Sequence, residues 1–245
     1  MSKTVEAPNN RIMVVEDDPT TRRLIEFLLE NDGFKVFGFE NGQDALQQAA
    51  EVRPDLVVMD LMMPDMDGFE LGKELRARKE FNKVPILVLT ARDTKVDKYE
   101  AFKVGADGFM SKPFDSLELL YSIRAFLRLT QQPEAKRIGG GNPVENGGIR
   151  LEPTKFNVTV YGQDIQLTRM ETAILHYLME HPGQVFSAEE LSVRVLESMQ
   201  GSGRSVDAVH AHIRNLRAKI EKDAKDPKIL VTMGRKGYYF AEQAA

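Results

Sequence analysis

The stretch VVMDLMMPDMDG, residues 57–68, places an aspartate between a short apolar run and a turn. Val57, Val58 and Met59 have the pattern of a buried strand, and Asp60 follows them directly. A carboxylate at the rim of an apolar core is costly unless cations or hydrogen-bond donors pair with it. We therefore expect Asp60 to be part of a site at the end of a strand.

Apolar runs of this kind recur along the first half of the chain and alternate with amphipathic segments. The runs are short and rich in Val, Ile, Leu or Phe, which is typical of buried parallel strands, and the segments between them have helical spacing. Helices are expected to follow Pro19, Asn41 and Asp67, and further helices to cover 96–104 and about 116–129. The order predicts an α/β class fold, a (βα)5 doubly wound parallel sheet whose strands end at one ligand-binding edge. The predicted strands are RIMVVE (11–16), KVFGF (35–39), DLVVMD (55–60), PILVLT (85–90) and GFMS (108–111).

The length of 245 residues favours two domains. Three consecutive Gly, two Pro and the loss of apolar spacing between the halves predict a flexible linker. Beyond it, short β patterns precede helical patterns at 169–180, 188–196 and about 205–221, and a strand–turn–strand pattern follows, so we predict an α+β winged helix-turn-helix domain. The expected boundaries are a tail at 1–10, a first domain at 11–130, a linker at 131–148, a second domain at 149–242 and a tail at 243–245.

Composition indicates a reducing compartment and a polyanionic partner. The chain has no Cys, its N-terminus lacks the apolar segment of a secretory signal, and no apolar run approaches the ~18 residues of a membrane span. We expect a cytoplasmic protein that does not bind membranes. The net charge of −4 hides a local excess at 204–236, where nine basic and four acidic residues favour binding to a polyanion such as nucleic acid.

Polar side chains follow the ends of several predicted strands, and parallel strands bring these ends to one edge of the sheet. Carboxylates about 4 Å apart repel by roughly 1 kcal/mol in water and about 4 kcal/mol at an effective dielectric of 20, so such a cluster favours a cation. An all-oxygen site suits Mg²⁺, and aspartate is a competent nucleophile for phosphoryl transfer beside a lysine and a hydroxyl. The residues expected at this edge are Glu16, Asp17 and Asp60, together with Thr90 and Lys112.

Two nearby acids have a simpler explanation. Asp18 stands before Pro19 at a predicted helix start, where a cap is more common than a metal ligand. The sequence DMDG at 65–68 resembles a piece of a calcium loop but lacks its ligand spacing and distal Glu. We therefore interpret Asp67 as an N-cap.

The motifs VVEDDP, VVMDLMMPDMDG, LTA and GADGFMSKPF closely resemble those of the receiver domain of bacterial response regulators, over about residues 11–130. The resemblance implies that a sensor histidine kinase phosphorylates Asp60 and that Phe109 is the switch aromatic. The chain would not be an enzyme beyond Mg²⁺-dependent phosphoryl transfer to its own aspartate and autodephosphorylation. By the same comparison, Mg²⁺ is held by Glu16, Asp17, Asp60 and the Met62 backbone carbonyl, while Thr90 and Lys112 sense the phosphoryl group.

The predicted helix at 205–221 has two different sides. Val209, Ile213, Leu216 and Ile220 repeat at helical spacing and are expected to face the core. On the other side, small Ala residues would let a nucleic acid approach closely, and Asn or Arg could read base edges. We expect that side to be exposed, and its residues are Ala208, Ala211, His212, Arg214, Asn215 and Lys219.

Residues 149–242 resemble the winged-helix DNA-binding domain of the OmpR/PhoB subfamily, through LTRMETAILHYLMEHPGQVFSAEEL, HIRNLRAKI and TMGRKGYYF. The resemblance implies double-stranded promoter DNA as a partner, with 205–221 as the recognition helix and 233–237 as the wing. RNA polymerase is a further candidate partner. Two departures are His210 in place of Asp and the order Gly234-Arg235 in the wing. The predicted DNA contacts are Arg204, His210, His212, Arg214, Asn215, Arg217, Lys219, Thr232, Arg235 and Lys236.

Receivers of this subfamily commonly dimerise through their fourth and fifth helices with crossed ion pairs. Exposed ion pairs contribute only ~0–1 kcal/mol each, so apolar packing could maintain a dimer without a full set. The resemblance implies a homodimer on activation, with an atypical interface. Lys98, Asp107 and Glu118 match the subfamily, whereas Gly108, Ser122 and Leu129 replace its usual Asp, Arg and Arg.

These observations predict a phosphorylatable transcription regulator, and two alternatives stay open. A phosphohydrolase of the haloacid dehalogenase kind would need a second acid two residues after Asp60, where Met62 stands, and a cap domain. A regulator whose receiver works without phosphate is favoured by the altered dimer interface, whereas the complete acidic site argues against it.

Overall fold

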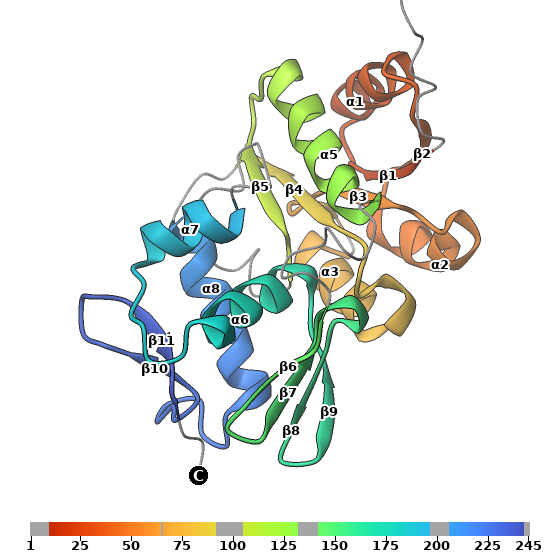
Figure 1. The fold of residues 1–245 in the computed structure, drawn as a ribbon. Helices are drawn as coiled ribbons and strands as arrows, with labels where there is room; N and C mark the ends of the chain where they lie inside the picture. The colour runs from red at the N-terminus through yellow and green to blue at the C-terminus, as the bar shows by residue number, and fades with distance from the viewer. Residues whose placement is uncertain (1–9, 65, 92–104, 132–141, 197–205, 243–245) are drawn as a thin grey trace, which may run out of the picture.

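The computed structural model describes residues 10–64, 66–91, 105–131, 142–196 and 206–242. The first domain is built on five parallel strands, as the sequence predicted, and the structure gives their order in the sheet as β2-β1-β3-β4-β5 (Figure 1). Both ends of each observed strand lie within one residue of the predicted ends. The strands are β1 (Arg11–Val15), β2 (Lys35–Phe39), β3 (Leu56–Asp60), β4 (Ile86–Thr90) and β5 (Gly108–Ser111).

Helices connect these strands, and three of them begin at a side-chain cap. Asp18, Asn41 and Asp67 each accept a hydrogen bond from the backbone N–H three residues later, so the cap interpretation of Asp18 and Asp67 is confirmed. The predicted fourth helix lies outside the described residues. The described helices are α1 (Pro19–Asn31), α2 (Gly42–Val52), α3 (Gly68–Ala77), the short η1 (Lys79–Phe81) and α5 (Ser116–Gln131).

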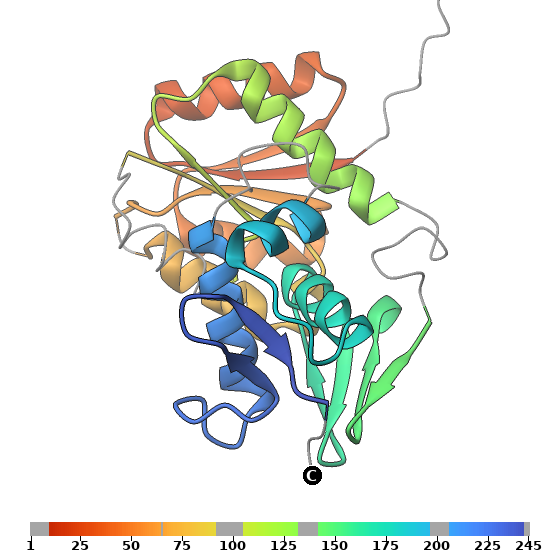
Figure 2. The ribbon, with the colours of Figure 1, turned by 60° about the vertical axis from the view of Figure 1, so that its left-hand side comes forward.

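The sheet has a hydrophobic cluster on each face because side chains alternate along a strand. In β1, Ile12 and Val14 belong to the cluster shared with α1 and α5, whereas Met13 and Val15 belong to the cluster shared with α2 and α3. Figure 2 shows α1 and α5 together over one face of the sheet. β1, β3, β4 and β5 are therefore buried between the helices, whereas the edge strand β2 is partly exposed. Polar residues lie at the carboxyl ends of the strands.

The second domain begins with a four-stranded antiparallel sheet that precedes three helices and a hairpin. The three predicted helices match the observed ones to within one residue. The linker prediction was wrong at both ends, because α5 continues to Gln131 and Val144–Asn146 forms a strand paired with Ile149–Leu151. The elements are β6 (Val144–Asn146), β7 (Ile149–Glu152), η3 (Pro153–Lys155), β8 (Asn157–Val160), β9 (Gln163–Gln166), α6 (Arg169–Glu180), α7 (Ala188–Leu196), α8 (Val206–Ile220), β10 (Leu230–Thr232) and β11 (Tyr238–Phe240).

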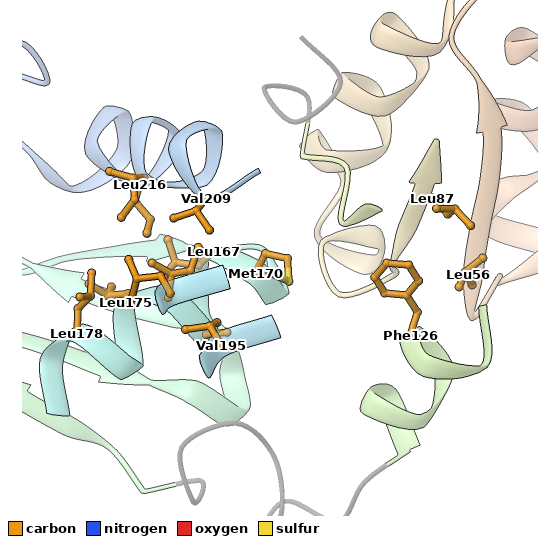
Figure 3. Close-up of a cluster of buried hydrophobic side chains, with 14 of the residues drawn as sticks. Leu56, Leu87, Phe126, Leu167, Met170, Leu175, Leu178, Val195, Val209 and Leu216 are labelled. Carbon is orange, nitrogen blue, oxygen red and sulfur yellow. The ribbon is translucent and has the colours of Figure 1, made fainter. Parts of the chain in front are cut away.

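The apolar stripe of α8 forms part of the core of the second domain, as predicted. Val209, Ile213, Leu216 and Ile220 are all buried, and Figure 3 shows Val209 and Leu216 directed toward the side chains of Leu167 and α6. Full burial of such a side chain contributes about 1.5–3 kcal/mol. This packing fixes the rotation of α8, and so decides which of its residues face away from the core. Within the described ranges, no helix has the length and apolar character to span a membrane.

Candidate functional site

Three carboxylates meet at the carboxyl edge of the parallel sheet. Glu16 and Asp17 follow β1, Asp60 ends β3, and their oxygen ligand atoms lie within 4.8 Å of one another. Glu16 and Asp60 are only 1% and 5% exposed. The convergence follows from topology, since β1 and β3 are neighbouring parallel strands. The sequence prediction of an acidic cluster at this edge is confirmed.

Lys112 from the loop after β5 ties two of these acids together. Its Nζ donates to Glu16 Oε2 and to Asp60 Oδ2, both at 2.6 Å. Burial raises the pKa of Glu16 and outweighs the opposing effect of Lys112. For Lys112 itself, burial acts to lower the pKa, but the hydrogen bonds to Asp60 and Glu16 outweigh it and the pKa is raised. The lysine therefore stays charged within the acidic cluster.

The cluster fits a hydrated divalent cation. Asp60 Oδ1 accepts a hydrogen bond from the Met62 backbone N–H at 3.0 Å, and Asp60 Oδ2 is bound to Lys112. Glu16 Oε1 is buried and has no hydrogen-bond partner among the described residues. A buried carboxylate oxygen without a partner is costly, and water molecules held by Mg²⁺ would satisfy it. The oxygen-only donor set is the kind that Mg²⁺ prefers.

Two further residues, which the sequence did not identify, help to form this acidic edge. From α1, Arg22 Nη1 donates to the carbonyl oxygens of Glu16 at 2.6 Å and Asp17 at 3.4 Å, which holds the acidic loop in place. At the start of α3, Gly68 lies so close to Asp60 that an added Cβ would come within 2.2 Å of the Asp60 carbonyl oxygen. The sequence signal for Gly68 was its place in the turn after Asp60, but its closeness to the strand end required the fold.

Thr90 and Phe109 come from the two strands beyond β3. Thr90 ends β4 and is fully buried, and its carbonyl oxygen accepts a hydrogen bond from the Lys112 N–H at 2.8 Å. Phe109 in β5 is 5% exposed and belongs to the cluster on the α2 and α3 face. Met62 is 43% exposed beside the acids. Thr90 and Met62 thus lie at the carboxyl edge with the acids, whereas Phe109 lies two residues before the end of β5 within a core cluster.

The predicted recognition helix presents a different face from the one expected. His210 and Arg214 are exposed, but Ala208, Ala211 and His212 are buried, so the expectation that these three residues lie on an open surface was wrong. The apolar pattern correctly identified the side that faces the core of the second domain. The apolar pattern gave no information about the opposite side of α8, where Ala208, Ala211 and His212 are also covered. Arg204 lies outside the described residues.

Other predicted DNA contacts hold the second domain together. Arg217 donates from Nε to the Leu230 carbonyl oxygen at 2.8 Å and from Nη2 to Thr232 Oγ1 at 2.7 Å, which joins α8 to β10. Lys219 Nζ donates to the buried carboxylate of Glu171 at 2.7 Å. Lys219 was expected on the DNA-facing side, and the structure instead pairs it with a buried acid. Arg235 and Lys236 are exposed in the turn between β10 and β11.

The predicted dimer residues are placed very differently from one another. Glu118 is exposed on α5, whereas Lys98 lies outside the described residues. Asp107 is 3% exposed and forms an ion pair with Arg76 at 2.7 Å, so its assignment to a surface interface was wrong for this structure. At Gly108, an added Cβ would meet Phe126 Cζ at 2.6 Å, which explains why no larger residue occupies this position.

Comparisons with known proteins agree with this geometry. The family model described as response regulator receiver domain matches residues 12–124, and the model described as transcriptional regulatory protein, C terminal, matches residues 162–240. A fold with a five-stranded parallel sheet, an acidic strand edge and a winged helix defines a receiver joined to a DNA-binding domain. By these two models the chain belongs to the two-component response regulators of the OmpR/PhoB type, and it is a transcription factor.

The chain is also similar to several solved structures. A variant of RitR shares 22% identity over 95% of this chain and 99% of that chain, with a TM-score of 0.72. DrrB, a Thermotoga maritima OmpR/PhoB homologue, shares 28% identity over 96% of this chain and 100% of that chain, with a TM-score of 0.47. A putative response regulator from Chloroflexus aurantiacus shares 32% identity over 49% of this chain and 99% of that chain, with a TM-score of 0.48. The phosphohydrolase alternative is set aside because the two family models match residues 12–124 and 162–240.

Proposed function

We propose that Asp60 is the phosphoacceptor of this response regulator and receives its phosphoryl group from a sensor histidine kinase. The observation that carries the proposal is the contact of Lys112 Nζ with both Glu16 and Asp60, next to the unpartnered Glu16 Oε1. A lysine at this point can spread the charge that develops on a transferred phosphoryl group, and the three carboxylates beside it could hold a cation.

The chemistry at Asp60 is an in-line displacement. A carboxylate oxygen of Asp60 attacks the phosphorus of a phosphohistidine, the P–N bond breaks, and its electron pair stays on the imidazole nitrogen. Bound Mg²⁺, held by Glu16, Asp17, Asp60 and the Met62 carbonyl, would supply charge neutralisation. Lys112 would then exchange its contact with Asp60 for one with a phosphoryl oxygen, and Thr90 would donate its hydroxyl hydrogen. Hydrolysis of the acyl phosphate by water would return the site to its resting state.

Intact-mass spectrometry tests this assignment. Wild-type protein incubated with acetyl phosphate and Mg²⁺ should gain one phosphoryl group, and Asp60→Asn should gain none. Asp18→Asn is the matched control, because Asp18 caps α1 and should leave phosphorylation intact. A wild-type protein that gains no phosphate would sink the proposal. It would favour a regulator that works without phosphorylation.

We infer that double-stranded promoter DNA binds to α8 and to the wing at 233–237. The exposed cations Arg214, Arg235 and Lys236 support this, since basic side chains on a recognition helix and wing contact bases and phosphates. A contact with RNA polymerase stays a prediction.

We propose that phosphorylation produces little dimerisation through the usual receiver face. Asp107 forms an ion pair with Arg76, Ser122 is buried, and Gly108 has no side chain. Few residues are therefore left to form crossed ion pairs between two receivers. Analytical ultracentrifugation of acetyl-phosphate-treated protein should show only a small rise in dimer over Asp60→Asn. A shift to a predominantly dimeric species would contradict this proposal.

A further inference from the structure

One side of α8 is exposed, while the other two are covered. Ala208 and Ala211 belong to a hydrophobic cluster whose other members are receiver residues, so that side lies against the first domain. Val209 belongs to the cluster that contains the core of the second domain. His210 and Arg214 are exposed and stand four residues apart, so they share the remaining side of the helix. That side is therefore open to an outside partner.

Tyr238 of β11 holds the ring of His210 in place. The backbone of Tyr238 is itself fixed, because its N–H donates to the Phe186 carbonyl oxygen at 2.8 Å and its carbonyl oxygen accepts from the Phe186 N–H at 2.9 Å. The Tyr238 hydroxyl oxygen lies 2.5 Å from His210 Nδ1, and the two rings meet edge to face with centroids 5.8 Å apart. Arg217 Cζ lies 5.6 Å from the centre of the same tyrosine ring. His210 is thus anchored to the hairpin that carries the wing.

This contact allows His210 to take up a proton without losing its anchor. Burial raises the pKa of Tyr238 against the opposing effect of Arg217, so the hydroxyl keeps its hydrogen and can donate to Nδ1 of the neutral ring. The proton of the neutral imidazole is then on Nε2. In the charged ring both nitrogens carry a proton, and Nδ1 donates to the tyrosine oxygen instead. In both states Nε2 is a donor for an outside acceptor.

The charges close to His210 favour an anion as that acceptor. Basic groups outnumber acidic ones around the ring, so a protonated imidazole would add to a positive surface. A phosphate oxygen fits this surface, because it accepts charge-assisted hydrogen bonds and favours the charged form of a histidine. The titratable and charged groups nearest to His210 are Asp207, Arg214 and Arg217 on α8 and Tyr238 on β11.

We propose that His210 takes up a proton from solvent when DNA binds and donates from Nε2 to a phosphate oxygen, so that this chain binds DNA more tightly in mild acid. The inference rests on the proposed function of α8 as the DNA-binding helix. It is particular to His210, because the aspartate that is usual at this position would repel the same phosphate. A solvated histidine takes up a proton near pH 6.5, so affinity should rise as the pH falls from about 8 toward that value and level off below it.

Fluorescence anisotropy of the full chain with a labelled mixed-sequence duplex at low ionic strength tests the proposal. One proton-linked contact should tighten binding roughly threefold to tenfold between about pH 8 and about pH 6. The log–log dependence of affinity on salt should also be steeper by about 0.9 at the lower pH, which a contact with a base would not produce. His210→Gln carries no charge and should lose most of both effects.

His181→Gln is the matched control. It removes a histidine from the end of α6, where His181 Nδ1 lies 2.8 Å from the Tyr177 carbonyl oxygen, and should respond to pH as the wild type does. Loss of the pH response in His210→Gln together with its retention in His181→Gln supports the inference.

The remaining outcomes separate this inference from the proposed function. If wild type and His210→Gln show the same pH response, the proton is taken up elsewhere and the inference is wrong. A loss of the response in His212→Gln alone would assign it to that buried histidine and would overturn the inference in the same way. If Arg214→Ala binds the duplex as tightly as the wild type at both pH values, the assignment of α8 as the DNA-binding helix fails instead.

Discussion

At the scale of single residues, the acidic edge depends on groups that add little chemistry of their own. Arg22 holds two carbonyl oxygens of the acidic loop, and Gly68 leaves space for the carbonyl oxygen of Asp60. Both contacts involve backbone atoms, which carry no sequence signature. The acids and Lys112 were predictable because charged residues at strand ends are recognisable candidates for binding a metal or a phosphoryl group. The roles of Arg22 and Gly68 were found only from the fold.

Gly68→Ala should therefore disturb the site without changing any charged group. The new Cβ would meet backbone at 2.2 Å, where nothing can move away cheaply, and overpacking of this kind typically costs about 1–3 kcal/mol. We expect a lower free energy of unfolding in denaturant titration and slower phosphorylation by acetyl phosphate. Gly38→Ala is the matched control, because its Cβ would clash only with the movable end of the Glu26 side chain and would lie at an ordinary contact distance of 3.6 Å from Arg22 Cδ. Equal stability of the two variants would refute this account of Gly68.

At the scale of elements, α8 has three sides with different tasks. One is core, one lies against the receiver, and one is open and carries His210 and Arg214. Arg217 links the helix to β10, so the wing and the helix are held as one unit. The periodicity of apolar residues predicted the core side. It could not separate the other two, because Ala is equally suited to a DNA surface and to a close domain contact.

Arg214→Ala should weaken binding of the cognate promoter. A side chain that pairs with a base is worth about 1–3 kcal/mol, and one that pairs with a phosphate should reduce the salt dependence of binding instead. Fluorescence anisotropy at several salt concentrations would distinguish the two. Lys225→Ala, an exposed lysine beyond the end of α8, is the control and should change affinity little. Unchanged affinity of Arg214→Ala at matched salt would count against the helix assignment.

At the scale of the whole molecule, the contact between the domains should depend on pH. Burial lowers the pKa of His212, against the opposing effects of Glu171 and Asp107, while Arg76 and Lys219 act in the same direction as burial. The docked state therefore favours the neutral imidazole, and the ordinary pKa of a solvated histidine is about 6.5. Docking is fully present above that value and is lost as the pH falls through and below it.

Distances between spin labels on Lys83→Cys and Lys155→Cys would measure this dependence. Acidification should lengthen the distance in the wild-type background and leave it unchanged in His212→Gln, which carries no proton-dependent charge. His210→Gln is the control, because His210 is exposed and hydrogen-bonded to Tyr238 at 2.5 Å. An identical pH response in wild type and His212→Gln would assign the effect to another group.

The sequence by itself determined the two domains, the five parallel strands of the first one and the acids at the carboxyl edge. It could do so because alternating apolar runs imply a parallel sheet, and the ends of parallel strands share one edge. It also determined the core side of α8 through the spacing of its apolar residues. Only the tertiary structure decided what covers Ala208, Ala211 and His212, and that Asp107 is buried against Arg76. These are contacts between segments far apart in the chain. Local sequence patterns do not determine which distant surface packs against a given side of a helix.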